Sequence, residues 1–145
     1  AVAAGCHMCV AAGRDAHPLR RIEAGERCSW FLADGSPVAA RKQWLADHVR
    51  LAGRLTLDAG AVRALVRDGK SLLPIGVVRV DGNFERGEIV GCFDPEGREV
   101  ARGLVNYSAS ETARILRKPS SEIAAILGYI DEPELIHRDN LVLLG

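Results

Sequence analysis

The residues with the clearest capacity for chemistry are four cysteines, two of which have the spacing of a zinc knuckle or a redox dithiol. Cys6 and Cys9 form a C-x-x-C motif, but a structural zinc site needs four ligands, usually from two such pairs. The second pair is missing, because Cys28 and Cys92 lie far apart in sequence. A redox dithiol normally opens a helix, whereas the run 6–12 is apolar and predicts a buried strand. We therefore predict buried, reduced cysteines, no metal site, and a reducing, cytoplasmic compartment.

Two polar clusters are further candidates for chemistry. His137, Arg138 and Asp139 are consecutive, but no nucleophile neighbours them, and a junction between a helix and a strand often uses such residues for hydrogen bonds. Asp94 and Glu96 lie in a polar turn, and two carboxylates on the tip of a turn do not make a metal site. We predict structural roles for both clusters.

Composition and charge exclude several classes of protein. With 48% apolar and 26% charged residues the chain is typical of a globular protein rather than a disordered one. No apolar run reaches the roughly 18 residues of a membrane helix, and the apolar start, broken by Gly5 and His7, is unlike a signal peptide. Because the chain begins with alanine, we expect a piece of a longer protein. The net charge is zero, so any contact with nucleic acid would depend on a local patch.

Residues 1–38 have the pattern of the end of an α/β domain. The run 6–12 predicts a central parallel strand, the spacing of apolar residues in 19–22 predicts a short helix, and 28–32 predicts a second strand. So few residues cannot bury a core of their own. This segment is expected to need either a missing domain or a partner surface.

The pattern changes after a linking helix predicted over 39–52, with Trp44 and Leu45 as its apolar anchors. A strand is expected at 55–57, followed by a helix that Asp58 caps. Further strands are expected at 77–80, 88–93 and 99–105, separated by turns at 81–83 and 94–97. Short strands at this spacing predict a mainly β fold, built on a small closed or nearly closed sheet with short flanking helices.

Three segments resemble the PUA domain family. The segment 69–77 resembles the loop and strand after the first PUA helix, 82–90 resembles the F-x-x-G-D-x-V signature with Glu88 in place of Asp, and 97–103 resembles the following G-x-x-(I/V)-A-x-G strand. The resemblance implies a PUA-type small β-barrel over 53–131. It also implies candidate RNA contacts, which are Lys70, Ser71 and Arg102. The alternative is an exposed loop that caps the barrel or packs on a neighbouring domain.

Four further motifs resemble the glutamate 5-kinase family. They are A-R-K-Q-W-L at 40–45, K-S-L-L-P at 70–74, R-G-L-V-N-Y at 102–107, and E-I-A-A-I-L-G-Y at 122–129 followed by H-R-D-N at 137–140. The resemblance divides the chain into the remnant of an amino-acid kinase domain (1–38), a linker helix (39–52), the PUA domain (53–131) and a C-terminal tail strand (132–145).

This second resemblance also implies a function for the whole protein. It implies ATP-dependent phosphorylation of the glutamate γ-carboxylate on the way to proline, with glutamate, ATP and Mg²⁺ bound by the kinase domain of a homo-oligomer without a membrane segment. The nucleotide-contacting motif of the family is absent from this sequence, so we place no catalytic, cofactor-binding or metal residue in it and expect the chain alone to be inactive. The alternative is a stand-alone PUA module that binds RNA in an RNA-modifying system.

Overall fold

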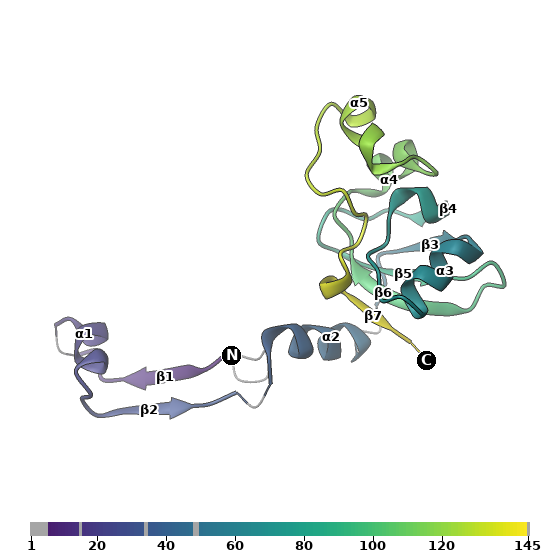
Figure 1. The fold of residues 1–145 in the computed structure, drawn as a ribbon. Helices are drawn as coiled ribbons and strands as arrows, with labels where there is room; N and C mark the ends of the chain where they lie inside the picture. The colour runs from purple at the N-terminus through teal and green to yellow at the C-terminus, as the bar shows by residue number, and fades with distance from the viewer. Residues whose placement is uncertain (1–5, 15, 34, 48–49, 145) are drawn as a thin grey trace. The chain divides into compact units, whose positions relative to one another are not determined.

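The computed structural model describes residues 6–14, 16–33, 35–47 and 50–144, which form two units (Figure 1). The first unit ends at Arg41 and the second begins at Lys42. Among the described helices, none combines the length and the apolar character needed to cross a bilayer.

The first unit is a two-stranded antiparallel ribbon with one short helix in the connection. Strand β1 (Met8–Ala11) pairs with β2 (Cys28–Phe31), and α1 (Pro18–Glu23) lies between them in sequence. The prediction of a buried central parallel strand is therefore wrong. The side chains of β1 alternate between exposed and half-buried, because β2 is its one neighbouring strand among the described residues.

Helix α2 (Pro37–Asp47) begins two residues earlier than the predicted linker helix. Leu45 is fully buried, as expected of an apolar anchor, whereas Trp44 is half exposed. Residues 48 and 49, in the predicted C-terminal half of this helix, lie outside the described residues.

The second unit is built on one five-stranded sheet in the order β4-β3-β5-β6-β7. Its strands are β3 (Gly53–Leu57), β4 (Val77–Gly82), β5 (Ile89–Phe93), β6 (Glu99–Leu104) and β7 (Leu141–Leu143). Strands β3 and β5 are parallel, and the other neighbours are antiparallel. A bridge between Leu72 and Ile136 joins the segments that lead into β4 and β7, the two edges of the sheet. The sheet is therefore nearly closed, as the strand spacing predicted.

Short helices surround the sheet. They are α3 (Ala59–Val66), η2 (Pro74–Gly76), α4 (Ala109–Ile115), η3 (Ser120–Glu122), α5 (Ile123–Leu127) and η4 (Arg138–Asn140). The predicted cap is confirmed, since the Asp58 carboxylate accepts from the backbone N–H of Ala61 at 2.7 Å. Ser108 caps α4 through a capping box with Glu111.

The core lies between the sheet and the helices. Its largest fully buried side chains include Tyr107, Phe84, Leu55, Leu72, Ile115 and Ile136. Phe84 lies against the backbone of Gly53, where an added Cβ would be 2.3 Å from the phenyl Cδ1. A glycine is required at this position because the ring fills the space that a side chain would occupy.

Candidate functional site

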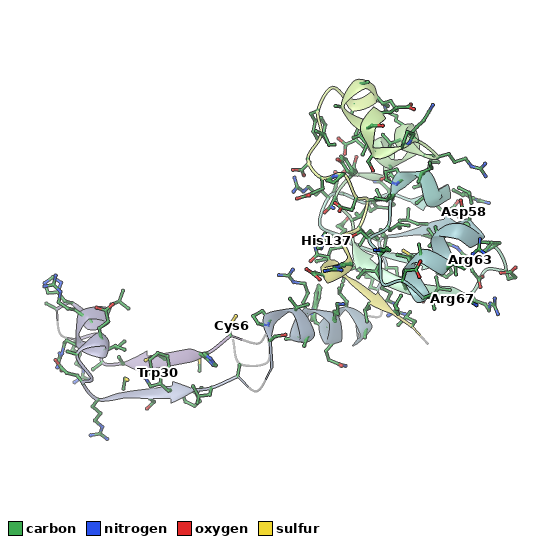
Figure 2. All side chains as sticks on the ribbon, in the orientation of Figure 1. Cys6, Trp30, Asp58, Arg63, Arg67 and His137 are labelled. Carbon is green, nitrogen blue, oxygen red and sulfur yellow. The ribbon has the colours of Figure 1, made fainter. Side chains whose placement is uncertain are left out.

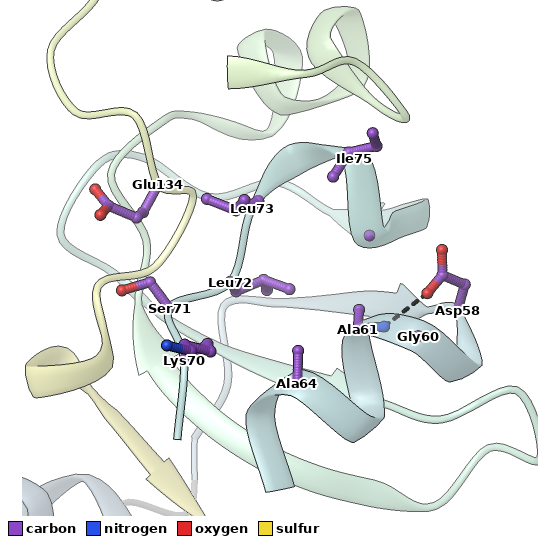
Figure 3. A pocket seen from close by; sticks show the side chains of 11 residues that line it. Asp58, Gly60, Ala61, Ala64, Lys70, Ser71, Leu72, Leu73, Ile75 and Glu134 are labelled. Atoms are coloured by element: carbon purple, nitrogen blue, oxygen red, sulfur yellow. Dashed lines mark hydrogen bonds between the residues drawn. The ribbon is translucent and has the colours of Figure 1, made fainter. Parts of the chain in front are cut away.

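A groove of about 560 Å³ lies between α3 and the segment 70–76 (Figure 3). Its walls are apolar and consist mainly of Ala61, Ala64, Leu72, Leu73 and Ile75. Polar groups stand at its rim, and these are Asp58, Lys70, Ser71 and Glu134. One ammonium group and two carboxylates therefore surround an apolar floor.

Local backbone chemistry positions the groove. Helix α3 ends at Val66, and Gly69, in the turn that follows, has a φ of +58°, the left-handed conformation that glycine adopts at little cost. The Lys70 N–H then bonds to the carbonyl of Ala64 at 3.1 Å. Farther along, Gly76 lies so close to α3 that an added Cβ would be 2.5 Å from the Cβ of Ala61. The segment 70–76 is thus held close along the helix. Arg63 and Arg67 lie on and just after α3 and are exposed (Figure 2).

Lys70 also lines a second cavity of about 440 Å³. This cavity carries two further cations, Lys42 and Arg138, and one carboxylate, Asp139, beside β7. The hydroxyl of Ser71 accepts from the backbone N–H of Arg138 at 3.1 Å, which ties the loop to η4. The structure therefore brings Lys70 and Ser71 together in a region with an excess of positive charge.

Arg102, the third candidate for RNA contact, lies on β6 and does not line the groove. Its guanidinium forms two bonds to the Glu99 carboxylate, at 2.6 and 3.1 Å, and donates to the carbonyl of Ala46 at 3.4 Å. The hydrogen bond to Glu99 raises the pKa of Arg102, and its side chain is 18% exposed. Arg102 is thus engaged in holding β6 and the C-terminal end of α2.

The two polar clusters have the structural roles that the sequence predicted. His137 caps η4, with its Nδ1 accepting from the backbone N–H of Asp139 at 3.2 Å. Asp94 is buried and accepts from both the backbone and the side chain of Arg98, at 2.8 and 2.7 Å. Burial alone would raise the pKa of Asp94, but these hydrogen bonds lower it overall. In the part of the chain that the structure describes, no cluster of three or more His, Cys, Asp or Glu could hold a metal.

The cysteines are reduced, but their burial differs from the prediction. Cys92 is fully buried, and burial, assisted by the Glu99 carboxylate, raises the pKa of its thiol to about 12. Cys6 is exposed, and Cys9 and Cys28 are half-buried. The apolar run around Cys6 does not produce burial, because the described ribbon has too few neighbours to cover it.

Several groups at the groove could not be predicted from the spacing of residues. Glu134 comes from the loop before Leu135, some 60 residues from Lys70, and only the tertiary fold brings the two to one rim. Lys42 and Arg138 likewise line one cavity with Lys70, although they are distant from it in the sequence. One feature of the sequence did point to the groove. Leu73 and Ile75, beside Pro74, are apolar although they lie in a segment that was predicted to be a loop.

The model of the PUA domain matches residues 53–127, which begin at β3 and end with α5. The chain therefore belongs to the PUA domain family. A solved PUA domain from Aeropyrum pernix is 32% identical, with a TM-score of 0.43 over 45% of this chain and 35% of that chain.

Curated relatives cover both units. A glutamate 5-kinase from Nitrosospira multiformis is 62% identical over 99% of this chain and 39% of its own length. One from Azoarcus sp. is 60% identical over 99% of this chain and 38% of its own length. The chain thus spans less than two fifths of the length of these relatives, and they are similar to it from the ribbon through to the PUA domain.

Proposed function

We propose that this chain is the C-terminal part of a glutamate 5-kinase. The observation that carries the proposal is the 62% identity to a glutamate 5-kinase over 99% of the chain, which includes the first unit as well as the PUA domain. The reaction transfers the γ-phosphoryl group of ATP to the γ-carboxylate of glutamate and releases ADP. The protein acts in the cytoplasm as a homo-oligomer, and its PUA domain has a regulatory or structural role.

The residues that bind glutamate, ATP and Mg²⁺ are proposed to lie in the remainder of the protein. Mg²⁺ prefers several oxygen ligands, from carboxylates and phosphates. Among the described residues, no acidic cluster meets that need. We therefore assign no catalytic or cofactor-binding role to any residue of this chain.

The first unit supports the proposal because it exposes apolar surface on both faces. Met8 and Phe31 are paired on one face and are 37% and 48% exposed, while Trp30 on the opposite face is 56% exposed. An isolated two-stranded ribbon is marginally stable in water. Apolar residues on both faces are typical of strands inside a larger sheet, as the C-terminal end of a kinase domain would be.

The proposal predicts where activity resides. We expect the 145-residue chain to show no glutamate-dependent ATP turnover, and a longer protein that contains it to show such turnover. ADP release with and without glutamate measures this, and trapping of the acyl phosphate by hydroxylamine identifies the product. Turnover by the 145-residue chain would contradict the placement of the active site. A longer protein that is inactive with glutamate would contradict the kinase itself.

RNA contact is a second candidate function, and the cavity shared by Lys42, Lys70 and Arg138 is the observation that favours it. Phosphate groups bind where ammonium and guanidinium groups gather, and such binding weakens as salt displaces it. The zero net charge of the chain confines this contact to the local cavity.

A salt titration tests the second function at one residue. If the cavity binds RNA backbone, Lys70→Ala should weaken binding about equally across sequences and reduce the slope of log K against log salt by about 1. A gel-shift series with short RNA hairpins measures both quantities. Lys118→Ala is the matched control, because Lys118 is exposed and lines neither cavity. Absence of binding, or binding that does not depend on salt, would exclude this function.

A further inference from the structure

Two cysteines that no sequence motif connects share one face of the β1–β2 ribbon. Cys9 is paired with Trp30, and Cys28 is paired with Ala11. Paired residues of an antiparallel ribbon point to the same face, and residues two apart on a strand do so as well. Cys9 and Cys28 are therefore diagonal neighbours on the face that carries Trp30.

The two cysteines of the C-x-x-C motif, Cys6 and Cys9, are not the two that the structure makes neighbours. Cys6 precedes β1 and is exposed, and two residues, His7 and Met8, separate it from Cys9. Because Cys6 lies outside β1, the register of the ribbon does not place its thiol beside that of Cys9, whereas it does so for Cys28. Between them, His7 is engaged at Nδ1, which accepts from the backbone N–H of Ala33 at 3.0 Å.

The two thiols of the diagonal pair are neighbours on one face of the ribbon. Burial, together with the neighbouring Cys28 thiol, raises the pKa of Cys9. Both side chains are half-buried in this 145-residue chain, so a small reagent can reach them. This pair thus combines proximity with access, whereas Cys92 is fully buried.

We propose that Cys9 and Cys28 form a two-thiol site for a thiophilic Lewis acid of the trivalent arsenic class. Thiolate sulfur is a soft ligand that selects soft acceptors. The diagonal geometry favours a bridging atom over a direct disulfide. Diagonal neighbours have Cα atoms roughly 7–8 Å apart, whereas disulfides usually need about 4.4–6.8 Å.

The reaction with an arsenoxide is balanced without an oxidant. Each Sγ–H bond breaks and each sulfur forms a bond to arsenic, while the arsenic–oxygen double bond is lost. The two protons leave with the oxygen as one molecule of water. Neither sulfur nor arsenic changes its oxidation state, so the protein needs no redox partner.

Phenylarsine oxide and intact-mass spectrometry of the folded 145-residue chain test the site. We expect a single adduct that survives excess β-mercaptoethanol and is removed by dimercaptopropanol, because a chelate resists a monothiol. Cys9→Ser and Cys28→Ser should each lose the resistant adduct. Cys6→Ser, the matched control, should keep it.

Cys28→Ser is the decisive variant because it leaves Cys6 and Cys9 intact. A resistant adduct on this variant would assign the arsenic to the C-x-x-C motif and overturn the proposal. Loss of the adduct cannot come from misfolding, because a misfolded variant would still offer Cys6 and Cys9. A resistant adduct is therefore scored on a variant whose circular dichroism matches that of the unaltered chain, with Cys28→Ala as the second variant. Loss of the adduct in Cys6→Ser, or its absence from the unaltered chain, would also overturn the proposal.

Discussion

Replacing Phe84 by alanine is expected to lower the free energy of unfolding of the second unit by about 3–5 kcal/mol. The side chain is 1% exposed and belongs to the main hydrophobic core. Its removal loses the apolar contacts and leaves a cavity that the surrounding strands fill only partly. Denaturant unfolding followed by circular dichroism measures the change. The matched control is Phe31→Ala, because Phe31 is 48% exposed in the first unit and should change the stability of the second unit by less than about 0.5 kcal/mol.

Gly53 provides an independent check on the packing of Phe84. Gly53→Ala alone is expected to cost about 1–3 kcal/mol, because the new Cβ would lie 2.3 Å from the ring and 2.9 Å from the carbonyl oxygen of Asp81. In the Phe84→Ala background the same change should cost less, since the ring is gone and the Asp81 carbonyl remains. Strictly additive costs would contradict the contact between Gly53 and Phe84.

Tyr107→Phe is expected to destabilise the second unit by about 1–3 kcal/mol, although it removes a single oxygen atom. The ring is fully buried, and its hydroxyl donates to the carbonyl of Glu132. The same oxygen accepts from the backbone N–H groups of Asp131 and Glu132, at 3.3 and 3.2 Å. Phenylalanine keeps the packing but leaves these backbone groups without their partner.

Hydrogen exchange locates the effect of Tyr107→Phe. Amides at 129–135 should exchange faster, because the hydroxyl fastens this loop to the segment between β6 and α4. Tyr129→Phe is the control, since Tyr129 is 47% exposed and donates to Glu111 at 2.5 Å outside the core. Equal effects of the two variants would show that the buried hydroxyl does not secure the loop. The loop carries Glu134 to the rim of the groove, so its exchange also reports on the candidate site.

Local features of the second unit could be predicted from the sequence because neighbouring residues produce them. Asp58 caps α3 as predicted, since a side chain and an N–H three residues away need no distant partner. Gly82 and Gly97, in the two predicted turns, have positive φ angles of 98° and 87°. The short strands between these turns predicted a nearly closed sheet, and the family match over 53–127 agrees.

The prediction for the first unit was less accurate for a physical reason. An apolar run such as 6–12 predicts burial, but burial depends on what covers the strand. Within the described residues β1 has β2 as its one strand partner, and that partner is antiparallel. The apolar run does not determine the direction of the neighbouring strand. It also does not determine how much of its own surface other elements cover.

The sequence by itself determined the PUA pattern, the cap of α3 and the turns, because these depend on residues close together in the chain. The tertiary structure alone decided which side chains meet. It placed Glu134 and Lys70 at one groove, engaged Arg102 with Glu99, and joined the two edges of the nearly closed sheet through the bridge between Leu72 and Ile136. In the first unit, strand register brings Cys9 to Cys28, although the motif in the sequence pairs Cys9 with Cys6. Contacts of this kind depend on strand register and chain topology, which residue spacing does not specify.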